Sequence, residues 1–198
     1  MPDELTVEYR DRVMIVRFTR PEIRNPLSVT VLDQMHLVLD EVRTRPEIEA
    51  LVFTGTGQSF ASGADLREIG AVNQQTAPAF ARYGQELMAR VAALETRTFA
   101  AINGYCFGGA LDLALACDAR IASSSAKFAH PGSGLGIITG WGGTQRLPQL
   151  IGRGNALEMF FTAEAIDAER AFAIGLIDEI AADPVAACLA NRVAAVSS

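Results

Sequence analysis

The sequence is poor in cysteine and has no long run of apolar residues. Its three cysteines, Cys106, Cys117 and Cys188, show no paired spacing. They therefore predict no disulfide framework, and without a C-x-x-C pair or a His/Cys cluster they predict no metal site. No apolar run approaches the roughly 18 residues that a membrane span needs. Residues 1–4 are acidic and lack the apolar core of a signal peptide. We therefore expect a cytoplasmic protein without metal or membrane partner.

Basic charge is also scarce. The chain has 198 residues with 17 Lys and Arg against 23 Asp and Glu, for a net charge of −6. The basic residues form no dense cluster, so we expect no nucleic acid among the partners. Hydrophobic residues at 49% and charged residues at 20% indicate a globular chain. The length suits a single domain over residues 1–198.

Hydrophobic periodicity predicts strands that alternate with helices. Thr6–Tyr9 and Val13–Thr19 alternate as in a β-hairpin, and a helical stripe starts at Val31, with Ser28 or Thr30 as its cap. Further strands are predicted at residues 50–54, 98–102, 120–123, 127–129 and 176–180, and helices at 80–95, 110–116, 144–150, 155–161, 168–173 and from 184. Glycine-rich loops are predicted at residues 104–109 and 132–143. The alternation favours an α/β architecture.

Four short motifs occur in order along the chain. Residues 20–28 read R-P-E-I-R-N-P-L-S, and residues 55–66 read G-T-G-Q-S-F-A-S-G-A-D-L. Residues 104–110 read G-Y-C-F-G-G-A, and residues 142–147 read G-G-T-Q-R-L. In sequence, order and spacing the four motifs resemble those of the crotonase (enoyl-CoA hydratase/isomerase) superfamily.

The resemblance implies a fold, a substrate class and an assembly. The fold would be crotonase-like (ClpP-like), with repeated ββα units and surrounding helices. The substrate would be an acyl-coenzyme A thioester, with no separate cofactor. The chain would assemble as a homotrimer or hexamer, and the helical tail that follows in relatives would be largely absent.

The resemblance also assigns residues. The backbone N–H groups of Ala64 and Gly109 would form an oxyanion hole, because an enolate oxygen needs fixed donors. Arg24 and Arg67 would lie near the CoA phosphates, with Ala64, Asp65 and Leu66 along the same binding segment, where Asp65 also suits a helix cap.

Two positions depart from the family pattern. Hydratases of this family use two glutamates, but the first position is Asp112 and the second is Gly132. Because hydration needs both an acid and a base, the usual two-carboxylate mechanism does not follow. Asp112 remains the best candidate acid/base, and His130 or Ser133 could assist near Gly132. We expect that a glutamate at position 132 would restore hydration if the backbone tolerates it.

Other interpretations remain open at this point. The missing carboxylate is compatible with a non-catalytic CoA-binding or assembly module. Ser59, Asp112 and His130 run in the order of a serine hydrolase triad, although only the partial elbow at residues 57–61 supports it. Trp141 either lines an acyl pocket or packs within its loop, and Cys106 is interpreted as a packing residue because no base lies beside it in the sequence.

Overall fold

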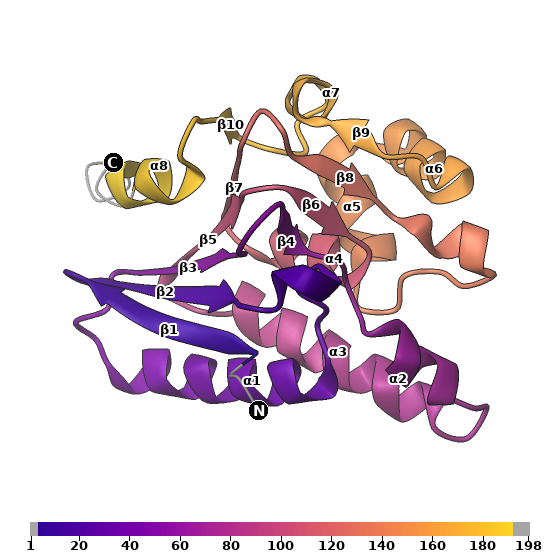
Figure 1. Ribbon diagram of the computed structural model, residues 1–198, viewed down its shortest axis with the longest axis horizontal. Coiled ribbons are helices and arrows are strands. Elements are labelled where there is room, and N and C mark those ends of the chain that lie inside the picture. The colour runs from indigo at the N-terminus through magenta and orange to yellow at the C-terminus, as the bar shows by residue number, and fades with distance from the viewer. Residues whose placement is uncertain (1–3, 192–198) are drawn as a thin grey trace.

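A computed structural model describes residues 4–191 of the chain (Figure 1). Its strands are β1 (Leu5–Arg10), β2 (Val13–Phe18), β3 (Ala50–Thr54), β4 (Ser59–Ala61), β5 (Arg97–Ile102), β6 (Tyr105–Phe107), β7 (Ala119–Ala122), β8 (Lys127–Ala129), β9 (Ile166–Asp167) and β10 (Glu179–Ile180). Its helices are α1 (Val29–Thr44), α2 (Leu66–Ala71), α3 (Ala77–Ala92), α4 (Gly109–Ala116), α5 (Gly143–Ile151), α6 (Arg153–Thr162), α7 (Ala168–Ala173) and α8 (Pro184–Asn191). Among these residues no helix is both long and apolar enough to cross a membrane. The predicted α/β class is confirmed, while the predicted domain limits, 1 and 198, lie outside the described residues.

Three ββα units repeat along the chain: β3–β4–α3, β5–β6–α4 and β7–β8–α5. Their first strands are parallel neighbours in a six-stranded sheet of order β1-β2-β3-β5-β7-β10. Their second strands are parallel neighbours in a four-stranded sheet of order β4-β6-β8-β9. Because the carboxyl ends of parallel strands meet at one edge, the segments that start at Ser62, Gly108 and His130 lie next to one another. The repeat therefore gathers three glycine-rich segments at one place.

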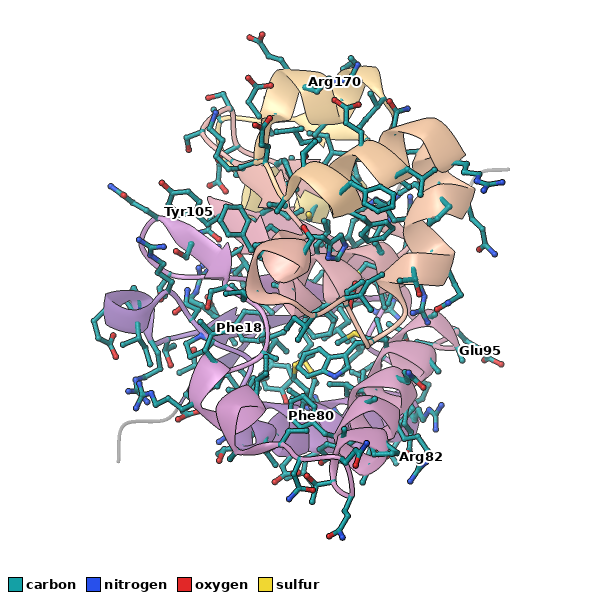
Figure 2. All side chains as sticks on the ribbon, turned by 90° about the vertical axis from the view of Figure 1, so that its right-hand side faces the viewer. Phe18, Phe80, Arg82, Glu95, Tyr105 and Arg170 are labelled. Atoms are coloured by element: carbon teal, nitrogen blue, oxygen red, sulfur yellow. The ribbon has the colours of Figure 1, made fainter. Side chains whose placement is uncertain are left out.

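The core lies between the large sheet and the helices α1 and α3, which run side by side in Figure 1. The α1 stripe Val31, Met35, Val38, Leu39 and Val42 is buried as predicted. Burying each such side chain contributes about 1.5–3 kcal/mol. The Ser28 hydroxyl accepts a hydrogen bond from Val31 N at 3.2 Å, so Ser28 is the cap of α1. Figure 2 shows Phe18 inside the molecule and Arg82 and Glu95 pointing outward.

Several boundaries differ from the sequence-based expectations. The turn predicted at residues 104–109 contains β6, and the loop predicted at 132–143 overlaps a 3-10 helix at Pro131–Leu135. The strand predicted at residues 176–180 is reduced to β10. The short helix α2 was not predicted, because its six residues are too few for a helical stripe. These differences concern short elements, where periodicity carries little signal.

Candidate functional site

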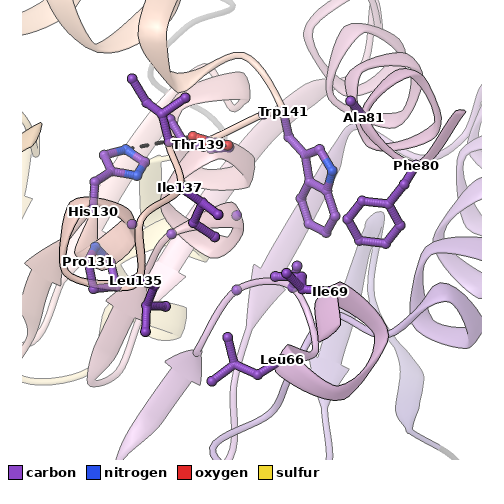
Figure 3. Close-up of a pocket in the computed structure, with 18 of the residues that line it drawn as sticks. Leu66, Ile69, Phe80, Ala81, His130, Pro131, Leu135, Ile137, Thr139 and Trp141 are labelled. Carbon is purple, nitrogen blue, oxygen red and sulfur yellow. Dashed lines mark hydrogen bonds and ion pairs between the residues drawn. The ribbon is translucent and has the colours of Figure 1, made fainter. Parts of the chain in front are cut away.

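A cavity of about 280 Å³ opens where the three glycine-rich segments meet. One wall is apolar and comes from α2 and α3, with Leu66, Ile69, Phe80 and Ala81 (Figure 3). The facing wall comes from the segment before α5, with Leu135, Ile137, Ile138 and Trp141. Polar groups gather at one end, on Asp112, His130 and Thr139. A mainly apolar cavity with a few grouped polar side chains is typical of a small-molecule site.

Ala64 and Gly109 both line this cavity, and their backbones lie close together. A Cβ placed on Gly109 would lie 3.4 Å from Ala64 N. Gly63 makes this approach possible, since its φ is +89° and a Cβ there would lie 2.8 Å from Gly109 N. Among the backbone hydrogen bonds formed outside the regular elements by residues 4–191, none is donated by Ala64 N or Gly109 N. Both are therefore candidate donors to a ligand, and Gly109 also begins α4, where the helix dipole favours negative charge.

Asp112 is completely buried on α4 at the polar end of the cavity. The Thr139 hydroxyl donates to its Oδ2 atom, while Oδ1 has no hydrogen-bond partner. Burial raises the pKa of Asp112 to about 7, although hydrogen bonds from the Thr139 hydroxyl and from the backbone of Trp141 and Gly143, together with the charge of Arg146, act in the opposite direction. The carboxyl group therefore exchanges its proton near neutral pH, as an acid/base catalyst must.

His130 follows β8 and is 3% exposed. Its Nε2 atom lies 3.7 Å from Asp112 Oδ1, the contact drawn as a dashed line in Figure 3. Phe160 packs against the ring, with centroids 5.1 Å apart. Burial lowers the pKa of His130 to about 4, so the imidazole is neutral at neutral pH. Both ring nitrogens lack a hydrogen-bond partner.

Gly132 and Ser133 contribute no side chain to the cavity. Gly132 lines it with backbone only, and Ser133 is exposed and lies outside the lining. A Cβ on Gly132 would lie 2.7 Å from the carbonyl oxygen of Ile137. The condition set on a glutamate at position 132 is therefore not met: the backbone of residue 137 occupies the space that a side chain needs.

Trp141 takes the first of the two roles that the sequence left open, since it lines the cavity. Its ring also packs against Phe80, with the two ring centroids 5.8 Å apart, and lies between the helices α3 and α4. A Cβ on Gly84 would lie 2.2 Å from the indole, and one on Gly109 would lie 2.5 Å from it. The sequence signal for this contact was Gly84, a glycine inside a helix, which usually marks a close approach.

The residues assigned to CoA lie in the segments that flank the cavity. The chain before α1 pairs with residues 62–64, since Leu27 N donates to Gly63 O at 2.8 Å. Arg24 is exposed in that chain, with its guanidinium 5.7 Å from the Tyr105 ring centroid. Arg67 is also exposed, and Leu66 lies at the cavity wall.

Asp65 caps α2 as predicted, accepting a hydrogen bond from Arg67 N at 2.8 Å. Arg24 and Arg67 are thus both exposed cations, and both stand on segments that lead into the cavity.

The serine hydrolase interpretation finds no triad in the described residues. Ser59 is buried on β4 outside the cavity lining, and His130 hydrogen-bonds to no side chain. Cys106 is fully buried and its pKa is raised by burial, which fits the packing role.

Comparisons with known proteins agree with this arrangement. A family model described as enoyl-CoA hydratase/isomerase matches residues 8–196. The chain is 38% identical over 179 residues to the short-chain-enoyl-CoA hydratase of Clostridium acetobutylicum, which covers 90% of this chain and 69% of that protein. It is 37% identical to the crotonyl-CoA hydratase of Syntrophomonas wolfei, with the same coverage. A crystal structure of an enoyl-CoA hydratase from Bacillus anthracis superposes with a TM-score of 0.93 at 32% identity, over 99% of this chain and 78% of that one. The chain belongs to the enoyl-CoA hydratase/isomerase family.

Proposed function

We propose that the cavity binds an acyl-CoA thioester and that the N–H groups of Ala64 and Gly109 stabilise the enolate formed from it. The observation that carries the proposal is the pair of candidate N–H donors held together at the cavity by Gly63. Fixed donors of this kind are effective because they need no reorganisation when charge develops on the oxygen. Asp112 is the group that moves the proton at the α-carbon, since its pKa near 7 suits both directions of transfer.

The shape of the cavity fits the acyl part of such a substrate. Its wall of Ile69, Phe80 and Ile138 is apolar, and Leu66 continues it towards the outside. The phosphates of CoA would remain at the surface, close to Arg24 and Arg67, which suits cations that are free to move on exposed side chains.

Binding is tested by the fluorescence of Trp141, which is the only tryptophan in the sequence and lines the cavity. Titration with butyryl-CoA should change the emission with saturation, and calorimetry should give about −8 kcal/mol or weaker. Arg24→Ala and Arg67→Ala should each weaken binding about tenfold. Arg43→Ala, an exposed position on α1, is the matched control. Absence of any signal at millimolar butyryl-CoA would refute the proposal.

A second candidate is a non-catalytic CoA-binding or assembly module, and Gly132 is the observation in its favour. The two functions differ in one measurement, the exchange of the α-protons of butyryl-CoA with deuterated water. An enzyme that forms the enolate catalyses this exchange, and the exchange is lost in Asp112→Asn. A module binds butyryl-CoA without exchange.

A further inference from the structure

Buried polar atoms without hydrogen-bond partners cluster at this cavity. Residues 4–191 contain five such side-chain atoms, and three of them are Asp112 Oδ1, His130 Nδ1 and His130 Nε2. Leaving a buried polar atom unpaired is unfavourable, so a group of such atoms in one cavity indicates a functional use. Two of the three, Oδ1 and Nε2, face each other at 3.7 Å. That separation is too long for a direct hydrogen bond and leaves both atoms available to a third group.

Thr139 engages one oxygen of Asp112, because its hydroxyl donates to Oδ2. The other oxygen, Oδ1, is the one that faces His130 Nε2 at the same end of the cavity.

We propose that His130 Nε2 is the base for the attacking water and that Asp112 Oδ1 is the acid for the α-carbon, so that this pair replaces the two carboxylates of a hydratase. The proposal rests on the function proposed above. In the step, the water oxygen bonds to the β-carbon of an enoyl-CoA as one O–H bond breaks. The water proton goes to Nε2, and the electrons of the C=C bond move onto the thioester oxygen. As the enolate electrons return to the α-carbon, Asp112 gives its proton to that carbon. The new hydroxyl group, lying between Nε2 and Oδ1, then relays the proton from His130 to Asp112. The sum is one water added.

Among the described residues that line this end of the cavity, no other side chain suits the task. Gly132 has none, Ser133 lies outside the lining, and the Thr139 hydroxyl is engaged with Asp112. Near neutral pH Asp112 is partly protonated and His130 is neutral, because burial raises the pKa of Asp112 to about 7 and lowers that of His130 to about 4.

The charged and titratable groups that face the pair are few. The charge of Arg146 on α5 lowers the pKa of Asp112, and Asp112 in turn raises the pKa of Cys106 on β6. Phe160 on α6 is the neighbour of the His130 ring.

The test compares two reactions in His130→Phe and His130→Gln. The first reaction is hydration of crotonyl-CoA, which is monitored by the loss of absorbance of the conjugated thioester. The second is exchange of the α-protons of butyryl-CoA in deuterated water, which needs Asp112 but no attacking water. His36→Phe is the matched control, because His36 is the only other histidine and lies on α1 outside the cavity.

Both His130 variants should lose hydration about 10²–10⁴-fold and lose much less of their exchange rate, whereas His36→Phe should leave both rates unchanged. The glutamine variant retains a polar side chain of similar size, so it serves if the phenylalanine variant fails to fold. The kcat/KM of the unmodified enzyme should fall as pH rises through about 7, where Asp112 loses its proton.

The assignment is overturned if His130→Gln hydrates normally, if exchange falls together with hydration, or if the unmodified protein exchanges α-protons but does not hydrate. If the unmodified protein neither binds butyryl-CoA nor exchanges its α-protons, the proposed function itself is refuted.

Discussion

Asp112 and His130 should give the folded state two opposite pH dependences that nearly cancel. Burial raises the pKa of Asp112 from 3.8 to about 7, so the folded state holds a proton that the unfolded state releases. Stability from this group is complete below about pH 4 and is lost as pH rises to about 7. Burial lowers the pKa of His130 from 6.5 to about 4, so its stability is complete above about pH 6.5 and is lost as pH falls to about 4.

Single substitutions should reveal each half of this balance. One pKa unit corresponds to about 1.4 kcal/mol. The unfolding free energy of Asp112→Asn, relative to that of the unmodified protein, should therefore rise by about 4 kcal/mol as pH goes from about 4 to 7. His130→Phe should show the reverse trend, gaining about 3 kcal/mol relative to the unmodified protein as pH falls from about 6.5 to 4. The double variant should differ from the unmodified protein by an amount that is nearly constant with pH between these limits.

The assay is urea unfolding monitored by Trp141 fluorescence. It is repeated at steps of about half a pH unit from about pH 4 to 8. Surface carboxylates titrate in the same range, but they are common to all four proteins and drop out of the differences. If the two single variants show slopes of the same sign, or no slope at all, then burial does not control these two groups and the assignment of acid and base fails.

Three further results are expected. Gly109→Pro removes the backbone N–H, whereas Gly109→Ala keeps it, and both place a Cβ 2.5 Å from the Trp141 ring. The proline variant should therefore exchange the α-protons of butyryl-CoA about 10²–10³-fold more slowly than the alanine variant. Equal rates would refute the oxyanion assignment. Gly132→Glu should lose about 1–3 kcal/mol in urea unfolding and gain no hydration, because its Cβ meets Ile137 O, and Gly132→Ala should lose a similar amount; faster hydration would contradict this. Light scattering should give the mass of a trimer or hexamer. Phe161 on α6 is 78% exposed, and Phe161→Glu should shift the measured mass towards the 21.1 kDa of a single chain. A mass of 21.1 kDa for the unmodified protein would refute assembly.

The sequence was sufficient where a local rule applies. Alternation predicted the β1–β2 hairpin, and the apolar stripe predicted α1 with its cap at Ser28. The ordered motifs also pointed to Ala64 and Gly109, which the fold brings to one cavity, while their role as oxyanion donors stays a prediction. These successes share a cause, because each depends on residues that are close in the chain or on a pattern that the whole family repeats.

The sequence was insufficient where distant segments meet without a periodic pattern. Thr139 lies 27 residues from Asp112, and nothing local indicates that its hydroxyl fixes one carboxylate oxygen. The role of Gly143 is equally non-local: a Cβ there would lie 2.1 Å from Asp112 Oδ1. The second glycine of the G-G-T-Q-R-L motif therefore provides space for the buried carboxyl group, a role that only the packed structure reveals.

Gly132 shows why a substitution in a motif should be interpreted together with its loop. From the sequence it is the loss of one carboxylate. In the structure its carbonyl accepts a hydrogen bond from Ile137 N at 2.9 Å, and the Ile137 carbonyl closes over the missing side chain. The loop conformation and the glycine are thus linked, since the Ile137 carbonyl oxygen would lie 2.7 Å from a Cβ at position 132. A carboxylate can return there only if the loop moves. In this loop conformation the side chains next to Asp112 are Thr139, which donates to Oδ2, and His130, which lies 3.7 Å from Oδ1. Of these two, His130 is the base that we propose in place of the carboxylate at position 132.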